Sequence, residues 1–239
     1  MHIFNIHLNY LFNLNIVKAT SSARLKISRS ASLYNSKIYV APGASLEIGE
    51  SVKINNAIIC VERGECVIKE KCIIGNTNKN QKTCIIINDG SLFVDHHTKL
   101  SLERIWIRFG GMLKIGCYTN VNYGSEIRSD ESIIIGSYNQ ISYGVRIWDT
   151  NTHNIMNSYD RRKITESHYP YYGYETSKPV TAPICIGDDC WIGEKASILK
   201  GTQIGNEIIV GYNCLLTGQK IPNKSIVVSQ SVLNIRSVD

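Results

Sequence analysis

Apolar residues stand six positions apart along the C-terminal part of the chain. They are Ile186, Ile192, Ile198, Ile204, Val210 and Leu216. This period does not fit an α-helix, because six residues turn a helix by about 600° and scatter the side chains around it. It fits a chain that bends after each flat segment, so that three segments close one coil and successive coils stack. The pattern therefore predicts an all-β fold, a parallel β-helix.

The same spacing extends through most of the remaining chain. Aliphatic pairs six residues apart recur at Ile27/Leu33, Ile48/Ile54, Ile68/Ile74, Val94/Leu100, Ile115/Val121 and Ile135/Ile141. The pairs follow one another at roughly the length of one coil of about 18 residues plus a small corner insertion. We expect the β-helix to span residues 25–228, with a cap segment at 1–24 and a tail at 229–239.

One long interruption breaks the repeat. Ile135 and Ile186 are 51 residues apart, so about 30 residues leave the coil there and return to it. We expect this excursion at residues 148–183, and long loops on rigid scaffolds commonly carry function. The loop contains one histidine near its start and a group of tyrosines. The tyrosines are Tyr159, Tyr169, Tyr171, Tyr172 and Tyr174.

His153 is the candidate general base, because imidazole titrates near neutral pH. Asp149 and Asn151 stand close enough in sequence to orient its ring or to contact an acceptor. Tyr171 and Tyr172 offer flat faces and hydroxyl groups that suit a sugar. The competing interpretation is that the histidine lies on the surface and that the tyrosines pack the loop onto the coils.

Composition narrows the class of partner. The chain has 239 residues and a formal charge of +6 without a dense basic run, which favours small anions and argues against a nucleic-acid partner. We interpret the eight cysteines as reduced core thiols of a cytoplasmic protein, with Cys60, Cys66 and Cys72 in one interior ladder, and expect no metal. Residues 1–20 lack the pattern of a signal peptide or a transmembrane span. They suit a strand or a short amphipathic helix that covers the first coil, and a peripheral membrane contact stays open.

Residues 184–205, which contain Trp191-Ile192-Gly193, resemble the signature of the hexapeptide-repeat acyltransferases, and so does the loop that leads to His153. The resemblance implies a left-handed parallel β-helix, a homotrimer, acetyl-CoA bound between subunits and a loop histidine as general base. It matches His153 to that histidine, and Asn120, within residues 118–122, to an acceptor-binding asparagine. The residues expected at the cofactor are Trp191, Gly193, Lys200, Gly211 and Lys220. Residues 228–232 depart from the family pattern beside the cofactor.

The layout is most similar to O-acetyltransferases of bacterial surface polysaccharides, of the capsule and polysialic-acid type. The expected reaction is direct transfer from acetyl-CoA to a sugar hydroxyl in a ternary complex, without an acyl-enzyme. N-acylation of an amino-sugar nucleotide is the alternative enzyme reaction. A γ-type carbonic anhydrase would use His96, His97 and His153 for zinc, and the tryptophan motif argues against it. A non-catalytic glycan-binding β-helix is the alternative of another class.

Overall fold

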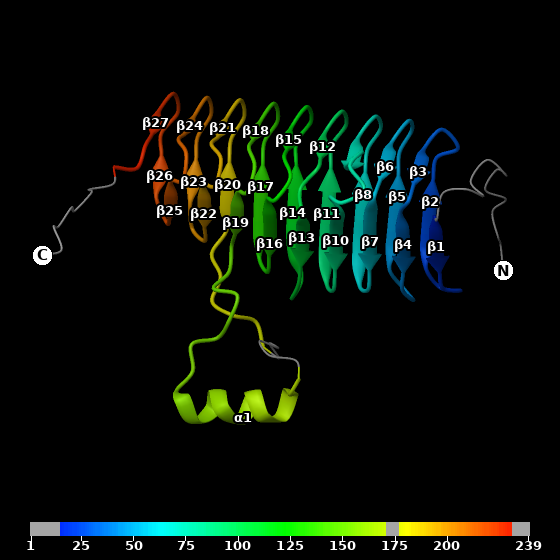
Figure 1. Cartoon of the computed structure of the whole chain (residues 1–239), viewed down its shortest axis with the longest axis horizontal. Coiled ribbons are helices and arrows are strands. Elements are labelled where there is room, and N and C mark those ends of the chain that lie inside the picture. The colour runs from blue at the N-terminus through cyan, green and yellow to red at the C-terminus, as the bar shows by residue number, and fades with distance from the viewer. Residues whose placement is uncertain (1–14, 171–176, 231–239) are drawn as a thin grey trace, which may run out of the picture.

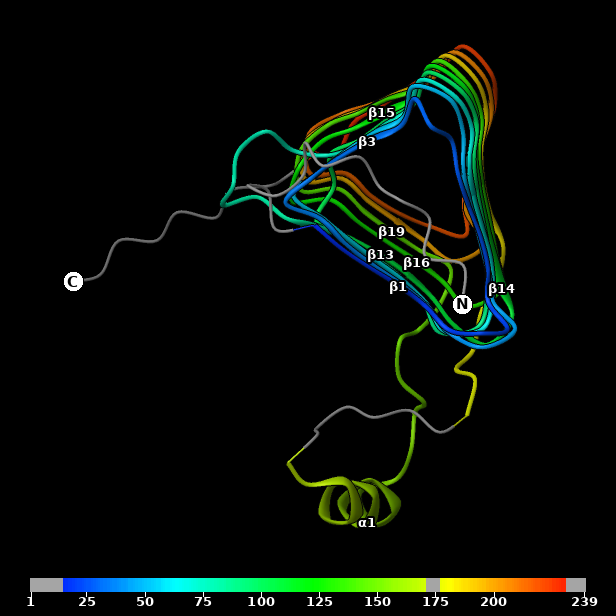
Figure 2. The same ribbon diagram turned by 90° about the vertical axis from the view of Figure 1, so that its right-hand side faces the viewer.

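The computed structural model describes residues 15–170 and 177–230. The chain forms a triangular solenoid whose three sides are sheets of nine parallel strands (Figures 1 and 2). Consecutive strands along the chain belong to different sheets, so every three strands complete one coil. The predicted left-handed parallel β-helix is confirmed.

The three sheets are named A, B and C. Sheet A contains β1 (Ile16–Ala19), β4 (Lys37–Val40), β7 (Ala57–Val61), β10 (Thr83–Ile87), β13 (Arg104–Ile107), β16 (Glu126–Ser129), β19 (Arg146–Trp148), β22 (Ser197–Leu199) and β25 (Leu215–Thr217). Sheet B contains β2 (Arg24–Ile27), β5 (Ser45–Ile48), β8 (Gly64–Ile68), β11 (Gly90–Val94), β14 (Gly111–Ile115), β17 (Ser132–Ile135), β20 (Ile184–Ile186), β23 (Gln203–Ile204) and β26 (Lys220–Ile221). Sheet C contains β3 (Ser32–Tyr34), β6 (Lys53–Asn55), β9 (Ile73–Gly75), β12 (Lys99–Leu100), β15 (Asn120–Val121), β18 (Gln140–Ile141), β21 (Trp191–Ile192), β24 (Ile209–Val210) and β27 (Ile226–Val227).

The residues of the six-residue spacing fill the interior. The C-terminal series from Ile186 to Leu216 is buried, and so are both members of every pair from Ile48/Ile54 onward. In-register stacking places like side chains above one another; Ile135 lies beside Ile186 although the excursion separates them in sequence. The apolar core is therefore one continuous column of aliphatic side chains.

Glycine is required where coils approach each other closely at a corner. Gly64, Gly90 and Gly111 lie in register at the start of neighbouring strands of sheet B. Gly90 has a φ of 138°, and a Cβ there would lie 2.1 Å from the carbonyl oxygen of Gly111. A side chain would clash with the backbone of the next coil, which explains the small residues at these corners.

The cysteines divide between the interior and the outer surface. Cys66, Cys72, Cys190 and Cys214 are buried, as their register predicted, and all eight are free thiols. The expectation of eight core thiols is wrong for the other four. Cys60 alternates with buried Ile59 and Val61 on β7 and therefore points outward, Cys84 and Cys117 are half-buried, and Cys185 is exposed. Cys185 and Cys190 are separated by four residues and face opposite ways, because Cys190 is buried and Cys185 is not.

The first coil begins before the boundary that the repeat suggested. β1 starts at Ile16 and pairs in parallel with β4, so part of the expected cap segment belongs to the solenoid. The remainder of that segment, residues 1–14, lies outside the described residues, as does most of the expected tail. Within the described ranges, no helix has the length and apolar character needed to cross a membrane.

Candidate active site

The chain leaves the solenoid at the corner between sheets A and B. β19 ends at Trp148 and β20 begins at Ile184, and the segment between them, residues 149–183, is called the excursion here. It projects from the side of the solenoid and carries α1 (Ser158–His168), which the sequence analysis did not foresee (Figures 1 and 2). None of the residues of α1 is buried, so the helix has no share in the core.

A short antiparallel stem holds the base of the excursion. Thr150 bridges to Thr181, and the N–H of Asn151 donates to the carbonyl of Val180 at 3.0 Å. The N–H of Ala182 donates to the carbonyl of Asp149 at 3.0 Å. The stem therefore fixes the chain just before His153.

Asp149 ties the stem to the coil beside it. Its side chain is fully buried and accepts hydrogen bonds from the Ser129 hydroxyl at 3.1 Å and from three backbone N–H groups. The three N–H donors are Asp130 at 2.8 Å, Glu131 at 2.9 Å and Ser132 at 2.7 Å. Burial raises the pKa of the Asp149 carboxyl, and the four donors act in the opposite direction. The expected contact of Asp149 with an acceptor is corrected: the carboxylate anchors the loop from a position that solvent does not reach.

His153 follows a strained residue. Thr152 has a φ of 69°, a left-handed conformation that is unfavourable for a β-branched residue. Its hydroxyl and the indole Nε1 of Trp148 are buried and have no hydrogen-bond partner within the described part of the chain. His153 itself is exposed, as is Asn151, whose carbonyl accepts the N–H of His153 at 2.8 Å. Backbone strain and unpartnered polar atoms thus gather where the candidate base lies, as is common at functional sites.

Arginine and tryptophan side chains support the root of the excursion on the outer face of sheet A. Arg128 lies in register between Trp106 and Trp148, with its Cζ 4.3 Å from the Trp148 ring centroid and 5.4 Å from that of Trp106. Glu126 pairs with Arg128 at 2.9 Å and with Arg104 at 2.6 Å. Burial raises the pKa of the Glu126 carboxyl, but the two arginines outweigh it and the net shift is downward.

A second ion pair steadies the corner that Asp149 binds. Arg108 donates to both oxygens of Asp130, with Nε at 2.9 Å and Nη2 at 2.7 Å, and both side chains are nearly buried. Because the N–H of Asp130 is one of the donors to Asp149, this bidentate pair fixes the backbone that receives the loop.

Asn120 and Trp191 lie on the other side of the solenoid. Asn120, Gln140 and Trp191 are in register on the outer face of sheet C, and 56% of Trp191 is exposed. The side-chain amide of Asn120 donates to Asn122 at 3.2 Å. Sheet C is opposite the corner from which the excursion leaves (Figure 2). One chain therefore does not bring His153 and Trp191 to the same face.

The other expected cofactor residues are spread around the coil. Lys200 lies at the corner between sheets A and B, and Lys220 lies on sheet B. Gly193 and Gly211 are stacked at the corner between sheets C and A, where a Cβ on Gly193 would lie 2.6 Å from the carbonyl oxygen of Val210. The close packing of neighbouring coils therefore explains why glycine stands at these positions, and no ligand is needed to explain it. Tyr171 and Tyr172 lie outside the described residues.

The sequence analysis missed a row of exposed aromatic side chains at the corner between sheets C and A. Tyr143 and Tyr212 are exposed there, and the ammonium of Lys195 lies 3.2 Å from the Tyr212 hydroxyl. The contact with Tyr212 raises the pKa of Lys195. The signal was available, because Tyr123, Tyr143 and Tyr212 each follow an interior anchor residue by two positions.

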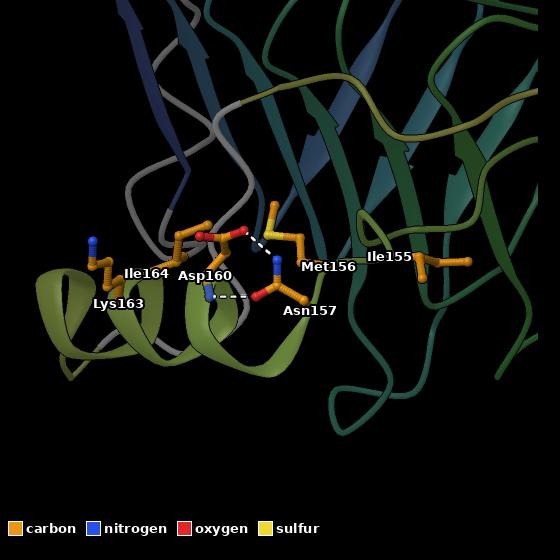
Figure 3. Close-up of a pocket in the computed structure, with 6 residues that line it drawn as sticks. All are labelled: Ile155, Met156, Asn157, Asp160, Lys163 and Ile164. Atoms are coloured by element: carbon orange, nitrogen blue, oxygen red, sulfur yellow. Dashed lines mark hydrogen bonds between the residues drawn. The ribbon is translucent and has the colours of Figure 1, made fainter.

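The excursion also forms a shallow hollow against the first turn of α1 (Figure 3). Its volume is about 530 Å³, and it is lined by Ile155, Met156, Asn157, Asp160, Lys163 and Ile164. Asn157 caps the helix, because its side-chain oxygen accepts the N–H of Asp160 at 2.9 Å. The mixed apolar and charged lining lies wholly on the excursion and away from the solenoid (Figures 1 and 3).

Comparison with known proteins finds a relative among the acetyltransferases. The putative lipopolysaccharide biosynthesis O-acetyl transferase WbbJ of Escherichia coli (strain K12) is 28% identical over 145 residues, which are 60% of this chain and 70% of that protein. The chain is therefore similar to an O-acetyl transferase over most of that protein's length. No family model matches the chain.

Two solved structures share the fold of this chain. The polysialic acid O-acetyltransferase OatWY aligns with a TM-score of 0.56 at 17% identity, over 92% of this chain and 93% of its own. The polySia-specific acetyltransferase NeuO aligns with a TM-score of 0.51 at 16% identity, over 93% of this chain and 88% of its own. At these identities the likeness concerns the fold.

Proposed function

We propose that this acyltransferase moves an acetyl group from acetyl-CoA to a sugar hydroxyl of a bacterial surface polysaccharide. The observation that carries the proposal is the similarity to WbbJ, a putative O-acetyl transferase of lipopolysaccharide biosynthesis, over most of that protein's length. The fold shared with two acetyltransferases of polysialic acid supports a polymeric sugar as acceptor. The eight free thiols agree with a reaction on the cytoplasmic side, where acetyl-CoA is available.

His153 is the general base of the proposed reaction. Its imidazole accepts the proton of the acceptor hydroxyl while the oxygen attacks the thioester carbonyl, and the acetyl carbon–sulfur bond then breaks to release CoA. General-base assistance of this kind contributes on the order of 10²–10⁴-fold to the rate. Two features support this role for His153. The residue is exposed, so that the acceptor can reach it, and Asp149 fixes the stem that precedes it in the chain.

The complete site would lie between copies of the chain in a homotrimer. This proposal is supported by the separation of the expected site residues within one chain. The excursion with His153 leaves from the corner between sheets A and B, whereas Asn120 and Trp191 lie on sheet C. In a ring of subunits, the excursion of one copy can face sheet C of the next. His153 of one subunit would then meet acetyl-CoA bound along Trp191 of its neighbour.

The test is acetyl transfer by the wild-type protein, by His153→Gln and by His168→Gln. His168 lies on α1 of the same excursion, so it is a matched control for loss of a loop imidazole. Each protein is incubated with isotopically labelled acetyl-CoA and a panel of acidic and neutral bacterial glycans, and label in the polymer is measured. This readout avoids thiol reagents, which would react with the exposed Cys185.

We expect acceptor-dependent labelling whose kcat falls about 10²–10⁴-fold in His153→Gln, with His168→Gln close to wild type. Equal activity of His153→Gln and wild type would contradict the assigned base. Absence of labelling with every acceptor, together with absence of acetyl-CoA binding in calorimetry, would contradict the transferase itself. Cross-linking and sedimentation measure the proposed trimer separately.

A further inference from the structure

The corner between sheets B and C carries one side chain per coil in a vertical column. Its members stand two residues after the in-register residues that end the strands of sheet B. From the middle of the solenoid to its C-terminal end, this corner column consists of His96, Cys117, Ser137, Asp188, Asn206 and Asn223.

The C-terminal half of the corner column has a structural task. Asp188 accepts the backbone N–H of Ser137 at 2.7 Å, and Asn206 accepts that of Asp188 at 2.9 Å. Asn223 accepts the N–H of Asn206 at 2.9 Å in the same way. Each carbonyl-type oxygen thus closes the corner of the coil before it, which explains why aspartate and asparagine recur there.

His96 and Cys117 replace this pattern in the middle of the column. The N–H of His96 donates to the carboxylate of Asp95 on its own coil, at 2.8 Å. The thiol of Cys117 lies 3.4 Å from the Ser137 hydroxyl. One donor atom each from Asp95, His96 and Cys117 lies within 4.8 Å of the other two, and all three residues are half-buried.

We propose that Asp95, His96 and Cys117 form a binding site for a zinc-type divalent ion. A thiolate, an imidazole nitrogen and a carboxylate oxygen are the three kinds of ligand that zinc takes from proteins. Because they come from two adjacent coils, the ion would join those coils at their corner. A water molecule can supply the fourth ligand.

Neighbouring side chains hold the proposed ligands in place. The Nδ1 atoms of His96 and His97 lie 2.9 Å apart, so one of them carries the proton of the hydrogen bond. When His96 donates, its Nε2 keeps a lone pair for the metal, which is the usual arrangement for a metal-binding histidine. His97 is itself stacked on Tyr118 at 4.8 Å, and Tyr118 on Tyr138 at 5.1 Å. With the thiol deprotonated, the Ser137 hydroxyl can donate to the sulfur.

The experiment uses the full chain without a histidine tag, freed of metal by a chelator and then titrated with Co²⁺. Co²⁺ bound to a thiolate gives a sulfur-to-cobalt charge-transfer band in the near ultraviolet, and Zn²⁺ should displace it. The variants are Cys117→Ser and His96→Gln. Cys84→Ser is the matched control, because Cys84 is also half-buried but lies on the outer face of sheet A.

We expect one equivalent of Co²⁺ per chain in the wild type and in Cys84→Ser, and loss of the band in Cys117→Ser. His97→Ala should weaken Zn²⁺ binding about 10–100-fold while the band is retained, because it removes a group that orients a ligand. Absence of the band in the wild type, or its persistence in both Cys117→Ser and His96→Gln, would overturn the site. Circular dichroism checks that each variant is folded, and the two ligand variants give independent tests.

Discussion

The coils and the excursion differ in how their side chains are packed. In the coils, each inward side chain between the ends of the solenoid lies in register with one above and one below, as Ile186 does between Ile135 and Ile204. In the excursion, none of the residues of α1 is buried, and the connection to the solenoid rests on a short stem and one buried carboxylate. The contrast indicates that stability and access to substrate come from different segments. The repeat supplies stability, and the break in the repeat supplies a group that a substrate can reach.

The largest expected difference concerns the core. Ile186→Ala removes a fully buried side chain from the aliphatic column and should lower the free energy of unfolding by about 2–5 kcal/mol. Ile155→Ala removes a side chain of the excursion that is 92% exposed and should change it by less than about 0.5 kcal/mol. Denaturant unfolding followed by circular dichroism measures both. Similar losses in the two variants would remove the distinction between coil and excursion.

The link between the two regions can be broken at Asp149. Asp149→Ala leaves buried N–H donors at Asp130 without their partner and should cost about 1–3 kcal/mol. It should also lower kcat, because the stem that carries His153 loses its anchor. Asp188→Ala is the control, since that exposed carboxylate accepts a backbone N–H at another corner. If Asp149→Ala left both stability and kcat unchanged, the stem would not depend on the Asp149 carboxylate for its position.

The ion pairs at the root of the excursion predict a dependence of stability on pH. The folded pKa of Glu126 is below its ordinary value of 4.5, so its contribution is present above that value and is lost as the pH falls through the lowered folded pKa. Glu126→Gln should therefore flatten the acid side of a plot of unfolding free energy against pH. Glu47→Gln removes a pair with Lys26 that solvent reaches, and it should flatten the acid side of the plot less. Parallel acid limbs for wild type and Glu126→Gln would contradict the prediction.

Only a small effect on stability is expected from shortening the excursion. Replacing residues 154–178 by a short Gly/Ser linker keeps the stem and Asp149, and should change the unfolding free energy by less than about 1 kcal/mol. The reason is that α1 contributes no buried residue to the core. Thermal unfolding of the shortened chain tests this, with the wild type measured in parallel. A loss of several kcal/mol would mean that the excursion packs on the solenoid.

The sequence predicts the coils well because the interior admits one kind of residue at one spacing. A buried residue every six positions is visible without any contact map, and the break in that spacing locates the excursion. The same spacing predicts which cysteines lie in the interior. The prediction fails for Cys60, because an outward position of a strand can also hold a cysteine. Periodicity thus reports which side chains point inward.

Periodicity does not report what gathers on the outside. The sequence predicts that Asp149 contacts the acceptor, whereas its four donors come from a neighbouring coil about one turn away in sequence. The cluster of Asp95, His96 and Cys117 escaped notice for the same reason, because its members belong to two coils. α1 was not foreseen, because it lacks an apolar face that would repeat along the helix. The spacing indicates which residues share a register position, but the contacts between their side chains are seen only in the folded chain.

The three tryptophans give the molecule a built-in optical reporter. Trp191 is largely open to solvent on sheet C, whereas Trp106 donates its Nε1 hydrogen to Asn88 and Trp148 is covered by Arg128. Acrylamide should therefore quench one emitting population more readily than the other two. Because the accessible indole lies on sheet C and the shielded Trp148 lies at the root of the excursion, fluorescence can distinguish a ligand on the sheet from a movement of the loop in a single titration.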